Sequence, residues 1–238
     1  MSKTSLLLAA FLFSILVPSC RPVPSPEVTP AKYSSEGFHR STVKIYIKTT
    51  TGYGTVSASG FAVDEYRFVT AGHFCENVAL GIDLNDLGNA VRIAFVNEHN
   101  NIEEIAGAEV VFSDAAIDLC LLETRRHRVP PATISMVPLG IHEEVSVVGA
   151  PLGLFPVTSP GRVVYASTVD FPITDLNRRL LLHVLGTHGN SGGPVFNAAG
   201  EVVGVVMSKF PSYDHALFCV TAGNLVSFLT ADPTYDGK

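Results

Sequence analysis

Twelve short, β-branched runs, which begin at Ser41 and continue almost to the end of the 238-residue chain, limit the fold more than any other feature. Turn-forming residues separate the runs, and there is almost no helical periodicity until "AGNLVSFL" (Ala222 to Leu229). Many short strands at close spacing are typical of all-β barrels and sandwiches, so we expect an all-β protein with a short C-terminal helix. The runs read STVKIYIKT, GTVSASGFAV, RFVTA, NAVRIAFV, AEVVFS, DLCLLE, EEVSVVGAP, GRVVYAST, LLLHVLG, GPVF, EVVGVVMS and ALFCVTA.

The polar segment "RRHRVPPAT" (Arg125 to Thr133) divides the runs into two nearly equal groups. A length of 238 residues, 47% of them hydrophobic and 16% charged, is sufficient for one large domain or two small ones with a core. We expect two β-barrels joined by a linker, at about residues 41–125 and 137–230. The formal charge of −6 offers no basic surface for a phosphate backbone, so nucleic acid is not an expected partner, and no cofactor or metal is expected.

The first residues have the pattern of a secretory signal. Lys3 precedes an apolar run from Leu6 to Val17, which is too short to span a bilayer comfortably. We expect residues 1–19 to be a signal peptide and the protein to be exported, either to the cell envelope or as a secreted protein. "VPSC", which ends at Cys20, also resembles a bacterial lipobox and implies a lipid anchor, although Pro18 departs from the usual pattern. An ordinary cleaved signal and an uncleaved anchor are the alternatives.

Residues 20–40 contain prolines at positions 22, 24, 26 and 30. Alternating prolines favour extended polyproline II conformation and cannot build a core. This segment is therefore expected to be a semi-rigid tether between a membrane and the folded body.

The stretch "GTHGNSGGPVF" (Gly186 to Phe196) places Ser191 among four glycines, which indicates that something must approach this backbone closely. A phosphate-binding loop would need a following helix and a nearby lysine, but a hairpin pattern follows here. The elbow of an α/β-hydrolase would need a strand, a turn and a helix, which Pro194 opposes. The third interpretation is a nucleophilic serine, which requires a histidine base, an orienting carboxylate and oxyanion donors.

Two other runs contain the required partners. "RFVTAGHFCENV" places His73 directly after a strand pattern, and "DAAIDLCLLE" places Asp118 at the start of an apolar strand pattern. Each alone is more typical of a structural residue, whereas a carboxylate in such apolar surroundings needs a partner. The combination predicts a catalytic triad of His73, Asp118 and Ser191.

"VTAGHF", "AIDLCLLE" and "GNSGGPVFNAAGEVVGV" resemble the three blocks of the trypsin-like serine protease superfamily, in the order His, Asp, Ser. "SGFAV", "VVGAPLGL" and "GRVVYAS" are most similar to the HtrA/Deg-type protease domain, and the resemblance covers roughly residues 41–230. It implies two six-stranded antiparallel barrels and a serine endopeptidase that acts on polypeptides through an acyl-enzyme. It also implies an oxyanion hole made by the backbone N–H groups of Gly189 and Ser191. Gly192 and Gly193 would then allow close strand packing behind the nucleophile.

The chain departs from the family in two places. Asn190 stands where digestive members carry an aspartate that pairs with a freed N-terminus, so we expect no activation of that kind. About eight residues, a tail at 231–238, follow the last helix, so we expect no appended PDZ domain.

The resemblance also assigns a primary specificity pocket, the site for the residue before the scissile bond. Its first wall contains no aspartate, which argues against cleavage after arginine or lysine. Leu185 favours small or medium aliphatic residues, whereas a ring of His215 turned into the pocket would favour glutamate or glutamine. The residues assigned to this pocket are Leu185, Gly186, Thr187, Val206, Met207, Ser208 and His215.

The chain has four cysteines, and if Cys20 carries a lipid at most one disulfide can form. Cys120 is most simply a small buried hydrophobic residue, and a nucleophilic Cys75 lacks glycine-rich surroundings. A catalytically inactive, protease-shaped binding module and a serine esterase are the alternative functions.

Overall fold

The computed structural model describes residues 35–47, 56–81, 91–125, 129–166, 179–209 and 215–235. The predicted signal peptide, Cys20 and most of the proline-rich tether lie outside these residues. None of the helices within them is long and apolar enough to cross a membrane.

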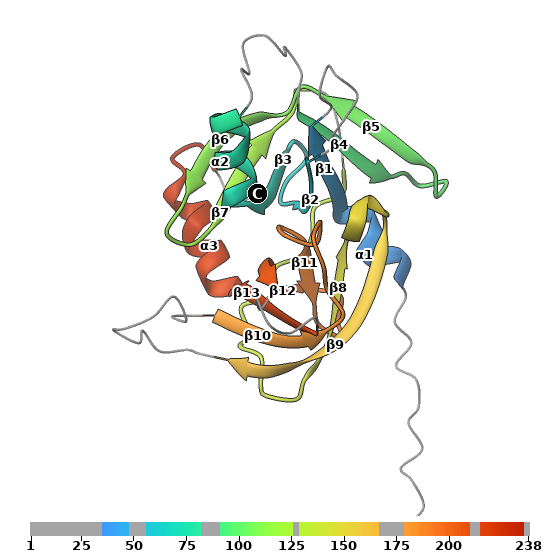
Figure 1. The fold of residues 1–238 in the computed structure, drawn as a ribbon, viewed down its shortest axis with the longest axis vertical. Helices are drawn as coiled ribbons and strands as arrows, with labels where there is room; N and C mark the ends of the chain where they lie inside the picture. Colours follow the sequence, from blue (N-terminus) through green and yellow to red (C-terminus); the bar gives the residue numbers. More distant parts are fainter. Residues whose placement is uncertain are drawn as a thin grey trace, which may run out of the picture. The chain divides into compact units, whose positions relative to one another are not determined.

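The N-terminal half forms a seven-stranded antiparallel sheet in the order β5-β4-β1-β2-β3-β7-β6 (Figure 1). One face of β1 is buried, while Lys44 and Tyr46 on the other face are half-buried. The strands are β1 (Thr42–Ile47), β2 (Val56–Ala62), β3 (Arg67–Ala71), β4 (Val91–Val96), β5 (Ile102–Ala106), β6 (Glu109–Asp114) and β7 (Leu119–Glu123).

The C-terminal half forms a closed six-stranded antiparallel barrel in the order β10-β13-β12-β11-β8-β9. Ile134 in the linker pairs with Val202 and so connects the linker to this barrel. The strands are β8 (Glu144–Gly149), β9 (Val157–Ala166), β10 (Arg179–Val184), β11 (Pro194–Phe196), β12 (Val202–Lys209) and β13 (Ala216–Thr221).

The predicted all-β class, the closed second barrel and the C-terminal helix are confirmed. All twelve predicted runs are strands, but the first half has a seventh strand, β5, and its described strands form an open ladder instead of a closed six-stranded barrel. β5 was not predicted from the sequence, because its adjacent Glu103 and Glu104 give it the polar pattern of a loop. In the structure Ile102, Glu103 and Glu104 are exposed. Charged residues of this kind are common on edge strands, where they oppose pairing with other chains.

Among the described residues, three helices and one 3₁₀ turn complete the fold. Thr221 caps the N-terminus of helix α3 (Ala222–Ala231), and its Oγ1 accepts a hydrogen bond from Asn224 N–H at 3.3 Å. Helix α2 (Gly72–Gly81) and the 3₁₀ turn η1 (Pro151–Gly153) follow β3 and β8. Helix α1 (Ser35–Ser41) lies mostly in the segment expected to be tether.

The folded body therefore begins before residue 41. Phe38 of α1 is buried and stacks on Phe196 of β11 with ring centroids 4.7 Å apart. Burial of this large apolar ring is favourable in free energy, so the last residues of the expected tether pack as part of the fold.

The two halves share one hydrophobic cluster in addition to a core of their own. Phe61, Val69 and Leu121 of the first sheet pack in the same cluster as Val205 of the barrel and Phe228 of α3. The predicted triad has two members in the first half and one in the second. The position of Ser191 relative to His73 and Asp118 therefore depends on apolar packing in this shared core.

Candidate active site

His73 and Asp118 come together because β3 and β7 are antiparallel neighbours. Ala71 pairs with Leu119, so the residues just beyond the strand ends face each other. Gly72 lies between them, and a Cβ there would stand 3.0 Å from the backbone of Asp118. Asp118 itself has a φ of 58°, a left-handed conformation that aspartate tolerates better than most residues. The register and this turn aim the carboxylate at His73.

The Asp118 carboxylate holds His73 through both its backbone and its ring. Oδ1 accepts a hydrogen bond from His73 N–H at 2.7 Å, and Oδ2 lies 3.0 Å from Nδ1. The hydrogen bond from His73 to Asp118 raises the pKa of His73 above its usual value, partial burial lowers it, and the charges of Asp118 and Glu76 raise it. With Nδ1 committed to the carboxylate, Nε2 is the nitrogen available to accept a proton.

Other backbone segments approach the loop around Ser191 closely at two of its glycines, as the sequence indicates. Gly189 has a φ of 99°, and a Cβ there would stand 2.2 Å from the carbonyl oxygen of Ala150. Gly192 has a φ of 81°, and a Cβ there would stand 2.3 Å from the carbonyl oxygen of Ser59. Both positions exclude a side chain on steric and conformational grounds.

Two backbone N–H groups beside the serine are available to a ligand. The carbonyl oxygen of His188 accepts a hydrogen bond from Leu152 N–H at 2.8 Å. Because a trans peptide directs its C=O and N–H in opposite directions, this bond turns the Gly189 N–H away from Leu152. Within the described residues, neither the Gly189 nor the Ser191 N–H has a hydrogen-bond partner. Free, preoriented donors of this kind can stabilise an oxyanion.

The hydroxyl of Ser191 donates to the carbonyl oxygen of Met207 at 2.9 Å and, in the described structure, makes no hydrogen bond to His73. His73, Gly189 and Ser191 nevertheless line one cleft of about 700 Å³. The serine side chain must therefore rotate about χ1 before the imidazole can accept its proton. Rotations of this kind are among the fastest side-chain motions.

Cys75 and Cys120 form a disulfide behind the histidine and the aspartate, with a Cα–Cα distance of 6.5 Å. Cys120 is buried, as expected, but it is bonded to Cys75 and is not simply a small hydrophobic residue. The register of β3 and β7 places the start of α2, which contains Cys75, beside β7. The disulfide joins α2, which carries His73, to β7, which follows Asp118. Cys219 is a free, buried thiol.

Replacing both cysteines, as Cys75→Ala with Cys120→Ala, is expected to lower the free energy of unfolding by about 4 kcal/mol. The bond closes a chain segment of 45 residues, and removing it restores that segment's entropy to the unfolded chain. Urea unfolding of the oxidised wild type and the double variant measures the difference. Adding a thiol reductant should destabilise the wild type and leave the double variant unchanged; equal midpoints for the two oxidised proteins would contradict the estimate.

The residues assigned to the primary specificity pocket do not all face one cavity. Leu185 is 65% exposed, and Val206 is buried in the barrel core, so only the backbone of Val206 can face a substrate. Gly186 packs against Leu217, where a Cβ would stand 2.6 Å from the leucine methyl groups. The ring of His215 is exposed and lies 6.0 Å from that of His183. Thr187 and Met207 are half-buried, and Ser208 is exposed.

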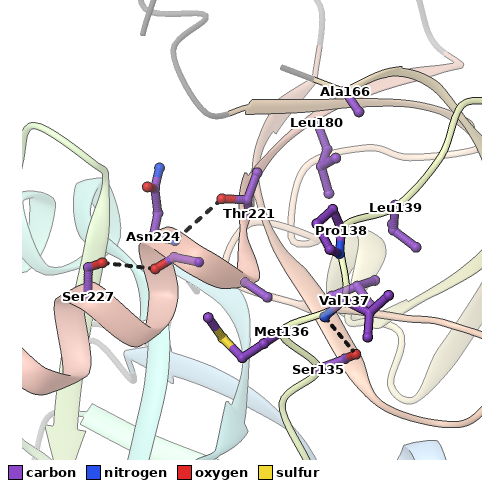
Figure 2. A pocket seen from close by; sticks show the side chains of 13 residues that line it. Ser135, Met136, Val137, Pro138, Leu139, Ala166, Leu180, Thr221, Asn224 and Ser227 are labelled. Atoms are coloured by element: carbon purple, nitrogen blue, oxygen red, sulfur yellow. Dashed lines mark hydrogen bonds between the residues drawn. The ribbon is translucent and has the colours of Figure 1, made fainter. Parts of the chain in front are cut away.

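A second cavity, of about 400 Å³, shares no lining residue with the cleft at Ser191. Figure 2 shows the linker residues Met136, Val137 and Pro138 on one side of it and the beginning of α3 on the other. Its polar groups are occupied locally, since Ser135 Oγ accepts from Val137 N–H at 3.3 Å and Ser227 Oγ donates to the Gly223 carbonyl at 3.0 Å. Nothing there resembles a catalytic arrangement.

Ser59 is a buried residue that organises the nucleophile loop and was not among the predicted site residues. Its hydroxyl donates to the Gly189 carbonyl at 2.6 Å and accepts from Ala150 N–H at 2.8 Å, while its N–H donates to the Ser191 carbonyl at 2.8 Å. These hydrogen bonds connect β2 of the first sheet to the Ser191 loop of the barrel. The block "SGFAV" contained the signal, because a buried serine in an apolar strand needs partners.

A family model described as a trypsin-like peptidase domain matches residues 58–205. The glutamyl endopeptidase of Staphylococcus epidermidis is 31% identical over 186 residues, which are 72% of this chain and 60% of that protein. A probable periplasmic serine endoprotease, DegP-like, of Hahella chejuensis is 32% identical over 99 residues, 41% of this chain and 21% of that protein. This chain therefore spans about 60% of the length of the first relative.

Solved structures share the fold. The Rv3671c protease of M. tuberculosis in its active form has a TM-score of 0.66 at 22% identity, with 96% of this chain and 95% of that chain covered. The serine endoprotease of Yersinia pestis has a TM-score of 0.63 at 20% identity, with coverage of 85% and 66%. At this level of identity the structures support the architecture alone.

Proposed function

Because this chain belongs to the trypsin-like peptidase family, we propose that it is a serine endopeptidase that cleaves polypeptides through an acyl-enzyme on Ser191. The observation that carries the proposal is the cleft that His73 and Ser191 both line, with both carboxylate oxygens of Asp118 behind the imidazole. The cleft also contains Gly189, whose N–H is unpaired within the described residues.

In the proposed reaction, Ser191 Oγ attacks the scissile carbonyl carbon while His73 Nε2 accepts the hydroxyl proton. Asp118 holds the ring and stabilises the imidazolium. The Gly189 and Ser191 N–H groups donate to the oxyanion. His73 then gives the proton to the leaving amine as the C–N bond breaks. Water, deprotonated by the same histidine, hydrolyses the ester and restores Ser191.

A fluorophosphonate probe, which phosphonylates only an activated serine, tests the proposal directly. We expect one mole of probe per mole of protein, located on the peptide that contains Ser191, together with loss of peptide hydrolysis. Prior occupation of the oxyanion hole by a peptide boronate should block labelling. A protein that neither labels nor hydrolyses peptides would instead be the protease-shaped binding module, and one that labels but cleaves only esters would be a serine esterase.

Cleavage after arginine or lysine is not expected. Position 185, at the beginning of the first wall, is a leucine, and nothing in this wall would pair with a buried cation. Peptides that differ only at the residue before the scissile bond measure the preference. Best cleavage after valine, alanine or leucine agrees with the assignment from Leu185. The name of the glutamyl endopeptidase relative favours the competing outcome, in which best cleavage after glutamate assigns selectivity to His215.

We also propose that the protein is exported and held to a membrane by a lipid on Cys20. The periplasmic relative supports export, and the proline-rich residues 20–34 suit a spacer. One acyl chain binds a membrane only marginally, so stable anchoring needs several. Metabolic labelling with a fatty acid should mark the wild type and not Cys20→Ala; equal labelling of both proteins, or of neither, removes the anchor.

A further inference from the structure

The cleft beside Ser191 continues away from the segments assigned to the residue before the scissile bond. Its lining includes His73, Ser191, Leu152 and Lys44, and it includes none of residues 185–187 or 206–208. In the proposed function the acyl part of a substrate lies on those segments. The cleft therefore lies on the leaving-group side, where the residues after the scissile bond would bind.

Lys44 is the charged side chain on this side of the cleft. It projects from β1 on the same face as Tyr46, and its Nζ lies 5.3 Å from the centroid of the Tyr46 ring. One ammonium hydrogen is donated to the carbonyl oxygen of Gly153 at 2.9 Å. An ammonium has three donors, so two are left for a ligand after the bond to η1.

No carboxylate on the described cleft wall neutralises this ammonium. The described lining residues contain no aspartate or glutamate, and His73 and His188 are its other ionisable groups. Glu104 is the carboxylate that β5 directs to the same face of the sheet. Its contacts are to Arg92, at 3.6 Å, and to Tyr46, whose pKa is raised to about 12 by burial and by the hydrogen bond to Glu104. Glu104 is thus already occupied by other partners.

We propose that Lys44 makes the leaving-group side of this cleft selective for a substrate carboxylate. The inference rests on the proposed peptidase function. The carboxylate is either the side chain of an aspartate or glutamate shortly after the scissile bond, or the C-terminus of a substrate that ends there. A half-buried ammonium with free donors binds such a group more strongly than an exposed one, because less solvent screens the pair.

Internally quenched peptides with one fixed residue before the scissile bond test the selectivity. Glutamate, glutamine or lysine is placed at each of the first three positions after that bond, with an amidated C-terminus. A second series ends two residues after the bond, as free acid or as amide. We expect kcat/KM about tenfold higher for glutamate than for glutamine at one position, or for the free acid over the amide, and a decrease of this ratio at high salt.

Lys44 variants assign the effect to the ammonium. Lys44→Met should bring the ratio of kcat/KM for the glutamate peptide to that for the glutamine peptide down to about one. Lys44→Arg should retain the ratio, and Lys44→Glu should favour lysine at the same position. Arg125→Met is the matched control for the loss of one surface cation, since Arg125 is exposed and pairs with Glu109 at 3.3 Å; it should leave the preference unchanged.

The outcomes separate this inference from the function on which it rests. Equal rates for glutamate, glutamine and both C-termini in an active wild type would overturn the selectivity alone. A uniform loss over all peptides in Lys44→Met would also overturn it, because Lys44 would then act only by holding η1. A wild type that hydrolyses no peptide would overturn the proposed function, and the inference with it.

Discussion

Ser191→Ala is expected to lower kcat for peptide hydrolysis by at least about 10⁴-fold while leaving the fold unchanged. The substitution removes only the oxygen that forms the acyl-enzyme, and the remaining oxyanion donors and binding groups support a small residual rate. The Ser191 hydroxyl contacts the Met207 carbonyl at the surface of the cleft, so its loss leaves no void in the core. Single-turnover kinetics together with the thermal midpoint measure both effects.

Ser227→Ala is a suitable control, because this exposed serine on α3 donates only to its own helix backbone at Gly223. It should retain the full rate.

Combining Ser191→Ala with His73→Ala should lower kcat little beyond the serine change alone, since members of a triad act as one unit and their losses do not add. Full activity in Ser191→Ala would exclude the acyl-enzyme mechanism.

The strands and the three triad candidates could be predicted because they depend on local chemistry. β-branched runs between turn residues specify strands whatever their partners, and each triad residue stands in a short, informative context. The glycines around Ser191 indicate close approach even when the approaching group is unknown. In the structure those groups are the carbonyl oxygens of Ala150 and Ser59.

Features that depend on register could not be predicted in the same way. The Cys75–Cys120 disulfide follows from the pairing of Ala71 with Leu119, which the sequence does not specify. β5 has the charged pattern of a loop and becomes a strand only because it pairs with β4. The contact from Lys44 to Gly153 joins residues 109 positions apart and has no local signature. Burial around residues 185, 206 and 215 likewise depends on how the barrel closes.

Asp118→Asn is expected to lower kcat/KM by about 10⁴-fold near neutral pH, on the scale of known triads. The Asp118 carboxylate accepts a hydrogen bond from the His73 backbone N–H at 2.7 Å, and its Oδ2 lies 3.0 Å from His73 Nδ1. An amide of the same shape can donate to Nδ1, and the ring proton then moves to Nε2, which can no longer accept the proton of Ser191. Affinity for a substrate-like inhibitor and the thermal midpoint should change far less than the rate.

The pH profile separates this role from a purely structural one. In the wild type the hydrogen bond to Asp118 raises the pKa of His73, so kcat/KM should increase with pH through a midpoint above the usual histidine value of about 6.5 as the imidazole loses its proton. Without the carboxylate, burial remains to lower that pKa, and the midpoint should move to lower pH. Asp114→Asn provides the matched control, because Asp114 accepts from Ala116 N–H at 2.8 Å in the preceding turn. If Asp114→Asn lost activity and Asp118→Asn kept it, the carboxylate that orients His73 would be Asp114.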